Sequence, residues 1–124
     1  MSSAPNKWGC LNGVNVMGQV ASIYDGDTLH VLAPVGEAGG TYDVKCRLAG
    51  INAPELKTPE GQAAKDALVG IVAETAGKVF CNFGANEKYG RPLVTLYGAP
   101  TKPSINQQLI ELGHAHSYDG HGPR

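Results

Sequence analysis

Residues 58–77, TPEGQAAKDALVGIVAETAG, carry the clearest helical signal of this 124-residue chain. Thr58 suits the N-cap position, and Pro59 suits the first helical position, where its missing N–H costs nothing. Gly77 is placed to end the helix. Apolar side chains recur at steps of three and four residues and predict one buried stripe, made of Ala64, Ala67, Leu68, Ile71 and Val72. The pattern predicts a helix with one face packed against a core.

Strand-like segments lie on both sides of this helix. Three precede it and two follow it: residues 14–23, 28–32, 41–48, 78–83 and 92–97. Asp25 and Gly26, between the first two segments, form the strongest hairpin signal in the chain. The order of three strands, a helix and two strands is that of an OB-fold barrel.

A second, shorter helix is predicted to begin after Ser104. Ser104 makes a capping box with Gln107, and Gly113 suits the C-terminal end. The inner stripe expected for this helix is Ile105, Leu109 and Leu112. The fold class is therefore α+β, mainly β, with a five-stranded OB-fold barrel and two to three helices. An open α+β sheet is the alternative that the pattern leaves open.

Length and charge bound the organisation of the chain. Two domains of half this size would each bury too little apolar surface, so we expect one domain at residues 14–118. Residues 1–13 are expected as a lead-in and residues 119–124 as a tail. No apolar run approaches the roughly 20 residues that span a bilayer, so no membrane partner is expected. A formal net charge of −1 excludes a protein that coats nucleic acid by charge alone.

The three cysteines, Cys10, Cys46 and Cys81, leave at least one thiol unpaired. Cys46 and Cys81 lie in strand-like segments, where a small buried thiol is the ordinary role. The odd count and the absence of a C-x-x-C pair favour a reducing compartment. The first seven residues lack the apolar stretch of a signal peptide. The localisation stays open: these features favour the cytoplasm, and export after removal of a leader is the alternative.

Four short motifs contain the residues suited to chemistry. In chain order they are D-G-D-T at residues 25–28, R-L-x-G-I-x-A-P-E at 47–55, K-Y-G-R at 88–91 and S-I-N-x-x-L-I-x-x-G-x-A at 104–115. Each motif alone is ordinary, because Asp-Gly occurs in many hairpins and charged loops are common. Together, and in this order, they closely resemble the staphylococcal nuclease (thermonuclease) family, from Val20 to Tyr118.

The resemblance implies a five-stranded OB-fold barrel and, in active members, an endonuclease that hydrolyses phosphodiester bonds of DNA and RNA with Ca²⁺. Single strands are the preferred substrate expected from it. By motif it implies that Glu55 is the general base and that Arg47 and Arg91 clamp the phosphate. Planar guanidinium groups match two phosphate oxygens at once, which supports these two roles.

The metal site implied by the resemblance consists of oxygen ligands. They are the Asp27 carboxylate, the Asn52 side chain and the Ala53 backbone carbonyl, with Asp25 behind them. Ca²⁺ is the expected ion, with Mg²⁺ or Mn²⁺ as alternatives. The resemblance also implies a nucleotide-contacting set, which is Lys88, Tyr89 and, by an approximate match, Tyr118.

Asn52 departs from the pattern, because most active relatives carry Asp at this place. An amide oxygen still ligates Ca²⁺, but the site loses one negative charge. One outcome is a nuclease that binds its metal weakly or uses another ion. The other outcome is a non-catalytic module that binds nucleic acid or protein. The retained Glu55, Arg47 and Arg91 favour the nuclease; a purely structural barrel is a third class, and it predicts no phosphate binding.

The histidines near the C-terminus offer a competing metal site. His114, His116 and His121 could together bind Zn²⁺ or Ni²⁺. Their spacing matches no standard zinc pattern, and His114 and His116 are expected to point in opposite directions.

The sequence gives no indication of the oligomeric state.

Overall fold

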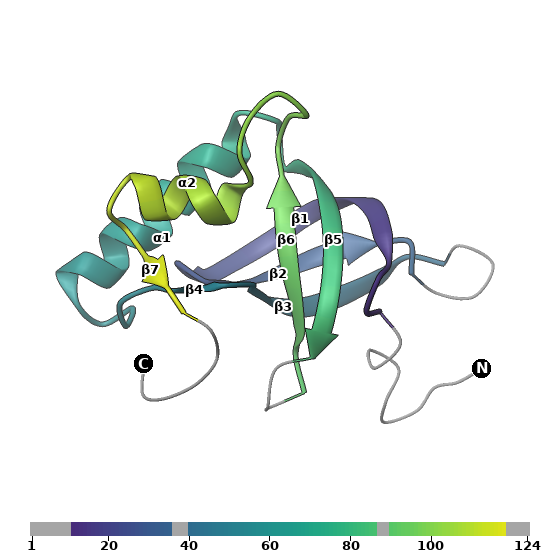
Figure 1. Cartoon of the computed structure of the whole chain (residues 1–124), viewed down its shortest axis with the longest axis horizontal. Helices are drawn as coiled ribbons and strands as arrows, with labels where there is room; N and C mark the ends of the chain where they lie inside the picture. The colour runs from purple at the N-terminus through teal and green to yellow at the C-terminus, as the bar shows by residue number, and fades with distance from the viewer. Residues whose placement is uncertain (1–10, 36–39, 87–89, 119–124) are drawn as a thin grey trace.

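Five strands close a barrel in the computed structural model, which describes residues 11–35, 40–86 and 90–118 (Figure 1). In their order around the barrel they are β1 (Asn15–Asp25), β2 (Thr28–Ala33), β3 (Tyr42–Leu48), β6 (Pro92–Tyr97) and β5 (Lys78–Asn86). Neighbours pair antiparallel except β3 and β6, which run parallel. The α+β class and the five-stranded OB-fold barrel are confirmed. Because β1 pairs with β5, the sheet closes and the open-sheet alternative is wrong.

β1 is the longest strand, and its apolar residues do not keep a strict period of two. The register shifts between Val20 and Ser22, and again between Ile23 and Asp25. A bulge adds one residue to one strand of a pair, so the inward and outward positions change places after it. These bulges also increase the local twist, which helps one strand pair with both β2 and β5.

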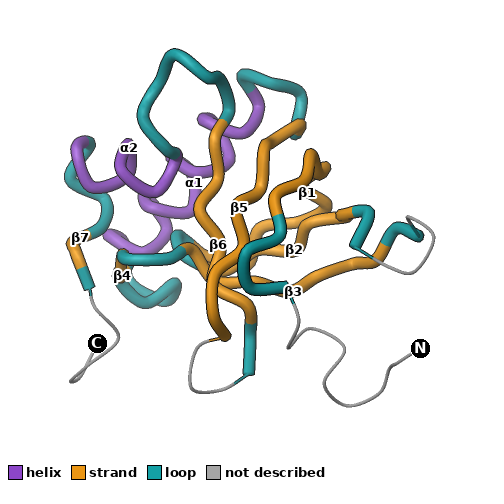
Figure 2. The backbone as a smooth tube through the Cα atoms, turned by 45° about the vertical axis from the view of Figure 1, so that its right-hand side comes forward, coloured by secondary structure: helices purple, strands orange, loops and turns teal. Residues whose placement is uncertain are grey.

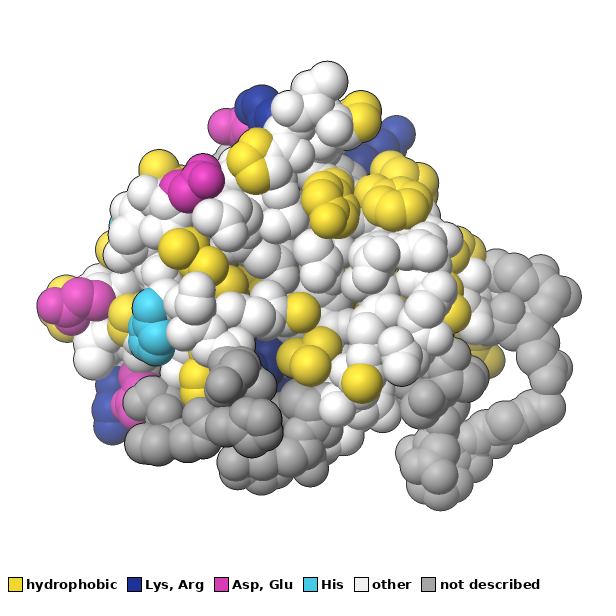
Figure 3. Space-filling model, in the orientation of Figure 1, with side chains coloured by type: hydrophobic (Ala, Val, Ile, Leu, Met, Phe, Trp, Pro, Cys, Tyr) yellow, Lys and Arg dark blue, Asp and Glu magenta, His cyan; other side chains and the backbone are white. Residues whose placement is uncertain are grey.

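The barrel interior is filled by buried side chains of β2, β3, β5 and β6, and partly buried Val16, Val20 and Ile23 of β1 pack against them. The fully buried set includes Leu29, Val31, Val44, Cys46, Leu48, Val79, Cys81, Phe83, Val94 and Leu96. Outward side chains alternate with them, as the pleat of a strand requires. The face seen in Figure 3 carries scattered apolar side chains, some of them over β5 and β6. Within the described residues, no helix is long and apolar enough to cross a bilayer.

α1 (Pro59–Ala73) forms where the apolar stripe predicted it. The Thr58 hydroxyl caps its N-terminus by accepting a hydrogen bond from the Gly61 N–H at 2.9 Å. The expected stripe is confirmed: Ala64, Leu68 and Val72 are buried, and Ala67 and Ile71 are partly buried against the core. The helix ends at residue 73, and the turn after it closes at Gly77, which has a φ of +83°.

α2 (Ile105–Glu111) packs beside α1 on one side of the barrel (Figures 1 and 2). Ser104 caps it by accepting a hydrogen bond from the Gln107 N–H at 3.0 Å. Ile105 and Leu109 are buried as expected, but the prediction for Leu112 is wrong, because it is 59% exposed. Leu112 follows the last helical residue, so it no longer shares the buried face.

A second, two-stranded sheet was not expected from the sequence. β4 (Ile51–Asn52) follows β3 and pairs antiparallel with β7 (His116–Ser117) near the end of the described chain. The Tyr118 N–H extends the pairing by donating to the Gly50 carbonyl at 2.9 Å. This small sheet brings the C-terminal segment beside the motif at residues 47–55.

Candidate active site

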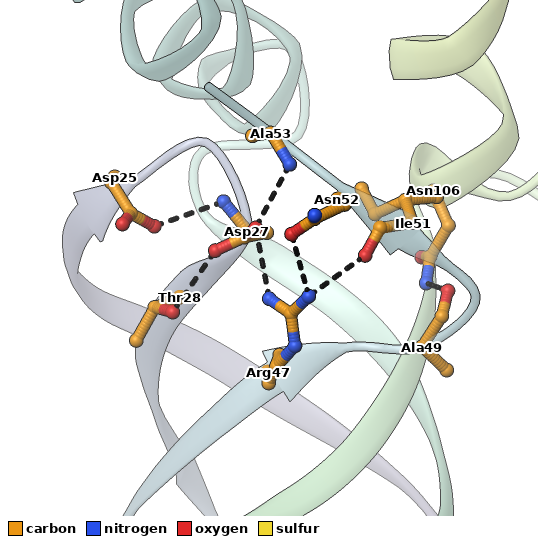
Figure 4. A network of polar contacts seen from close by, with 9 residues as sticks. All are labelled: Asp25, Asp27, Thr28, Arg47, Ala49, Ile51, Asn52, Ala53 and Asn106. Atoms are coloured by element: carbon orange, nitrogen blue, oxygen red, sulfur yellow. Dashed lines mark hydrogen bonds and ion pairs between the residues drawn. The ribbon is translucent and has the colours of Figure 1, made fainter. Parts of the chain in front are cut away.

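A buried ion pair between Asp27 and Arg47 forms the centre of the site (Figure 4). Arg47 Nη1 lies 2.8 Å from Asp27 Oδ2, and the two residues are 7% and 0% exposed. Thr28 pairs with Arg47 across β2 and β3, so the β1–β2 turn meets the end of β3. The Ala53 N–H donates to Asp27 Oδ2 at 2.9 Å, and the Thr28 hydroxyl donates to Oδ1 at 3.2 Å. The fold therefore joins the first two motifs around one carboxylate.

The pKa of Asp27 lies below its ordinary value of 3.8. Burial by itself raises this pKa, because a charged group loses its hydration. The hydrogen bond from the Ala53 N–H, the hydrogen bond and charge of Arg47, and a hydrogen bond with Asp25 together outweigh burial. Asp27 is therefore an anion at neutral pH.

The turn that presents Asp27 is held by two contacts. The Asp27 N–H donates to Asp25 Oδ1 at 3.0 Å, so Asp25, the last residue of β1, supports the turn. A Cβ added at Gly26 would lie 2.7 Å from the Ala64 Cβ and 2.8 Å from the Ala53 Cβ. Glycine is needed here because the turn packs directly against α1 and the segment after β4.

Asn52 lies on the other side of the guanidinium. Arg47 Nη2 donates to Asn52 Oδ1 at 2.9 Å and to the Ile51 carbonyl at 3.1 Å. Asn52 is 1% exposed and is held in β4 by pairing with His116. The amide oxygen that was expected to face a cation thus accepts a hydrogen bond from Arg47 in this structure.

Asn106 in α2 connects the helix to the strand ends below the site. Its amide donates to the Ala49 carbonyl at 2.8 Å and to the Val94 carbonyl at 3.0 Å, and its oxygen accepts from the Leu96 N–H at 3.1 Å. These bonds hold the chain between β3 and β4 and so support the position of Asn52. This role was not predicted from the sequence, although Asn106 is part of the fourth motif.

Tyr118 is brought to the site by β7. Its ring centroid lies 5.8 Å from the Arg47 Cζ, within the range of a cation–π contact. The resemblance placed an aromatic ring near the nucleotide, and the structure puts this ring over the arginine expected to bind phosphate.

Two further predicted residues, Glu55 and Arg91, are among those that the structure describes. The Glu55 side chain is 64% exposed, and one of its oxygens lies 3.5 Å from the Lys57 Nζ. Arg91 comes two residues before Leu93, which pairs with Arg47 across β3 and β6. Arg91 thus directly precedes β6, the strand that pairs with the strand of Arg47. Lys88 and Tyr89 lie outside the described residues.

The oxygen ligands present suit a hard cation in kind but not in charge. Asp25, Asp27 and Asn52 offer carboxylate and amide oxygens, which Ca²⁺ accepts. Arg47 already balances one of the two carboxylates. Among the residues that the structure describes, no group of three or more His, Cys, Asp or Glu side chains could hold a metal ion. This includes His114 and His116, whereas His121 lies outside the described ranges.

Comparison with known proteins identifies the family of this chain. Residues 45–124 match the family model described as staphylococcal nuclease homologue. The matched residues make up more than half of the chain. The chain belongs to the staphylococcal nuclease family. The match contains Arg47, Asn52, Glu55 and Arg91, whereas the Asp27 turn precedes it.

Several curated relatives of this staphylococcal nuclease homologue are each 32% identical to it. An uncharacterized endonuclease of Escherichia coli O157:H7 aligns over 106 residues, which is 85% of this chain and 63% of the relative. The alignment with an uncharacterized endonuclease of Haemophilus influenzae covers 81% of this chain and 51% of the relative. The alignment with Protein ParB of Escherichia coli covers 85% of this chain and 59% of the relative. The chain thus spans about half to two thirds of these relatives. Family and relatives support a nuclease or a nucleic-acid-binding role.

Proposed function

We propose that this chain is a metal-dependent nuclease that hydrolyses phosphodiester bonds of DNA and RNA without selecting the sugar. The observation that carries the proposal is the buried Asp27–Arg47–Asn52 network with the exposed Glu55 three residues beyond it. Burying an ion pair adds little to stability, because desolvation offsets the attraction of the two charges. A binding or catalytic role explains the network better than a structural one.

In this proposal Arg47 and Arg91 hold the scissile phosphate. Asp27 and Asn52 fix the direction of the Arg47 guanidinium before substrate arrives, so little reorganisation is needed during the reaction. Both arginines stabilise the negative charge that grows on the phosphate oxygens. The Tyr118 ring, Lys88 and Tyr89 would contact the nucleotide beside that phosphate.

Glu55 orients a water molecule and accepts its proton, a role worth about 10²–10⁴ in rate for a general base. Its exposed side chain stands where water has access. Asp27, Asn52 and the Ala53 carbonyl, supported by Asp25, would hold Ca²⁺, or Mg²⁺ or Mn²⁺ in its place. A bound ion supplies positive charge to the non-bridging phosphate oxygens.

A cleavage assay tests the proposal. The purified chain is incubated with labelled single-stranded DNA and RNA in Ca²⁺, Mg²⁺, Mn²⁺ or chelator, and we expect metal-dependent cleavage of both polymers. Glu55→Gln should lower the rate by about 10²–10⁴. Glu60→Gln is the matched control, because Glu60 is an exposed carboxylate in the first turn of α1. Cleavage with none of the three ions, or an unaffected Glu55→Gln variant, would contradict the proposal.

A second candidate is a binding module that does not cut. It is favoured by the Asn52 amide, whose oxygen accepts from Arg47 and brings no charge to a metal site. This candidate predicts that nucleic acid binds equally well in chelator and that no product forms over long incubation. If nucleic acid binds only with the metal present and is also cleaved, the result would favour the nuclease.

A further inference from the structure

Three large apolar side chains form an exposed row across the outer face of three neighbouring strands. Met17 of β1 pairs with Phe80 of β5, and Phe80 pairs with Tyr97 of β6. They are 57%, 38% and 36% exposed, respectively. Residues directly opposite each other on paired strands have Cβ atoms about 4.5–5.5 Å apart, so the row is continuous. Exposed apolar clusters of this kind commonly mark contact surfaces.

The row lies on the same outer face as the candidate active site. Leu93 of β6 pairs with Arg47, and the positions of Leu93, Thr95 and Tyr97 alternate with buried residues of the same strand. Tyr97 follows Leu93 by four residue steps, which is about 13 Å along β6. A stacked nucleic-acid strand covers this distance with about four nucleotides at 3.4 Å each.

The surface between the site and the row offers hydrogen bonds and no negative charge. Asn82 of β5 pairs with Thr95 of β6 at outward positions. Neither strand contains Asp or Glu, and Lys78, which is exposed two residues before Phe80, is their one charged residue. Figure 3 shows no acidic side chain over β5 and β6. A phosphate backbone that crosses this face therefore meets no repulsion from these strands.

We propose that a single-stranded nucleic acid leaving the candidate site runs along β6 and stacks bases on Phe80 and Tyr97, with Lys78 near a phosphate. The inference rests on the proposed function and extends it to substrate length. Aromatic rings accept the face of any base. Because the bases of a duplex are already stacked on each other, this surface favours single strands.

A second copy of the chain is the other candidate occupant. Stable protein interfaces bury about 800 Å² per partner, and three partly exposed side chains offer well under that area. The contiguity with Arg47 and the absence of carboxylates on β5 and β6 favour nucleic acid instead.

Binding to two probes of different length tests the inference. The probes are a fluorescent thymidine oligomer of about 12 nucleotides and a thymidine dinucleotide, measured in Ca²⁺ with Glu55→Gln as background to prevent cleavage. The double variant Phe80→Ala/Tyr97→Ala should bind the oligomer at least about 30-fold more weakly, since each of the two stacked bases contributes about 1–3 kcal/mol. Its affinity for the dinucleotide should stay unchanged. Tyr42→Ala, at an exposed tyrosine of β3, is the control and should bind both probes normally.

Each other outcome overturns the inference in a recognisable way. Unchanged oligomer affinity in the double variant shows that no base stacks on this row. An equal loss for both probes shows that Phe80 and Tyr97 support the candidate site itself and do not form a separate contact along β6. A wild-type dimer that the double variant disrupts without changing oligomer affinity assigns the row to a second copy. If the chain with intact Phe80 and Tyr97 binds neither probe, the proposed function fails along with this inference.

Discussion

The Cα of Gly61 in α1 lies directly against the backbone carbonyl of Glu55. A Cβ at position 61 would overlap that carbonyl group and lie 2.9 Å from the Cα of Leu56. The same carbonyl accepts hydrogen bonds from the Thr58 N–H at 3.0 Å and from the Thr58 hydroxyl at 2.7 Å. The first turn of α1 therefore determines where the backbone of the proposed general base lies.

Gly61→Ala should move Glu55 without changing any side chain at the phosphate. We expect kcat to fall by about 10²-fold, the effect of a displacement near 1 Å, with KM largely unchanged. Gly70→Ala is the matched control in the same helix, because a Cβ there meets no atom within 4 Å. It should stabilise the chain by about 0.5–1 kcal/mol and leave kcat unchanged, as steady-state kinetics and urea unfolding would show. Equal kcat values for the two variants would show that Gly61 does not position Glu55.

Asn52→Asp should tighten Ca²⁺ binding and raise the cleavage rate. The added carboxylate brings a negative charge beside Asp27, where a divalent cation has the strongest attraction. We expect at least about tenfold tighter binding by calorimetry, since extra ligand charge is what tunes Ca²⁺ affinity. Asn15→Asp makes the same charge change at an exposed position at the start of β1 and should leave binding unchanged. Unchanged or weaker Ca²⁺ binding by Asn52→Asp would place residue 52 outside the metal site.

Arg47→Met should destabilise the fold as well as remove a phosphate contact. It leaves the fully buried Asp27 carboxylate without its cationic partner, a change that costs about 3–5 kcal/mol. Urea unfolding measures this loss. The double variant Arg47→Met/Asp27→Asn should recover part of it, because no buried charge then remains unpaired. A single variant with wild-type stability would show that Asp27 finds compensation elsewhere. For activity assays, the exposed Glu55 is therefore the cleaner residue to change.

The buried thiols should be unreactive in the folded protein. Burial raises the pKa of Cys46 and of Cys81 to about 12, and the nearby Cys81 thiol adds to the shift at Cys46. Since the thiolate is the reactive form, labelling at pH 8 should proceed only as fast as the chain unfolds. The measurement uses a Cys10→Ser background, because Cys10 lies outside the described residues. Rapid labelling under native conditions would contradict it.

The same shift has a consequence for stability. A thiol whose pKa is higher in the folded state than in the unfolded state favours folding. This contribution is fully present below the unfolded pKa of about 9 and is lost as the pH rises toward the folded pKa of about 12. Alkaline unfolding of the Cys10→Ser protein should therefore begin above about pH 9, and its onset should coincide with thiol labelling.

Local patterns in the sequence were enough to predict most elements. Thr58 and Pro59 determine the start of α1 through a hydrogen bond and a backbone angle that involve only their neighbours. The order of these elements predicted a barrel, but only the pairing of β1 with β5 excluded an open sheet. β4 and β7 could not be predicted, because two-residue strands carry no periodicity and pair across more than 60 residues of chain. The exposure of Leu112 depends on where α2 ends, which a stripe pattern places only to within a residue or two.

For the site, the sequence by itself determined the residue types and their order, and through them the family. It also identified Asn52 as the departure from the pattern. Only the tertiary structure decided that Arg47 is shared between Asp27 and Asn52, that Tyr118 lies over it, and that Gly61 supports Glu55. Asp27 and Tyr118 lie far from Arg47 along the chain, whereas the Arg47–Asn52 and Glu55–Gly61 contacts are local but depend on how the intervening turns pack. Their geometry arises from barrel closure and helix packing, which act on the whole chain at once.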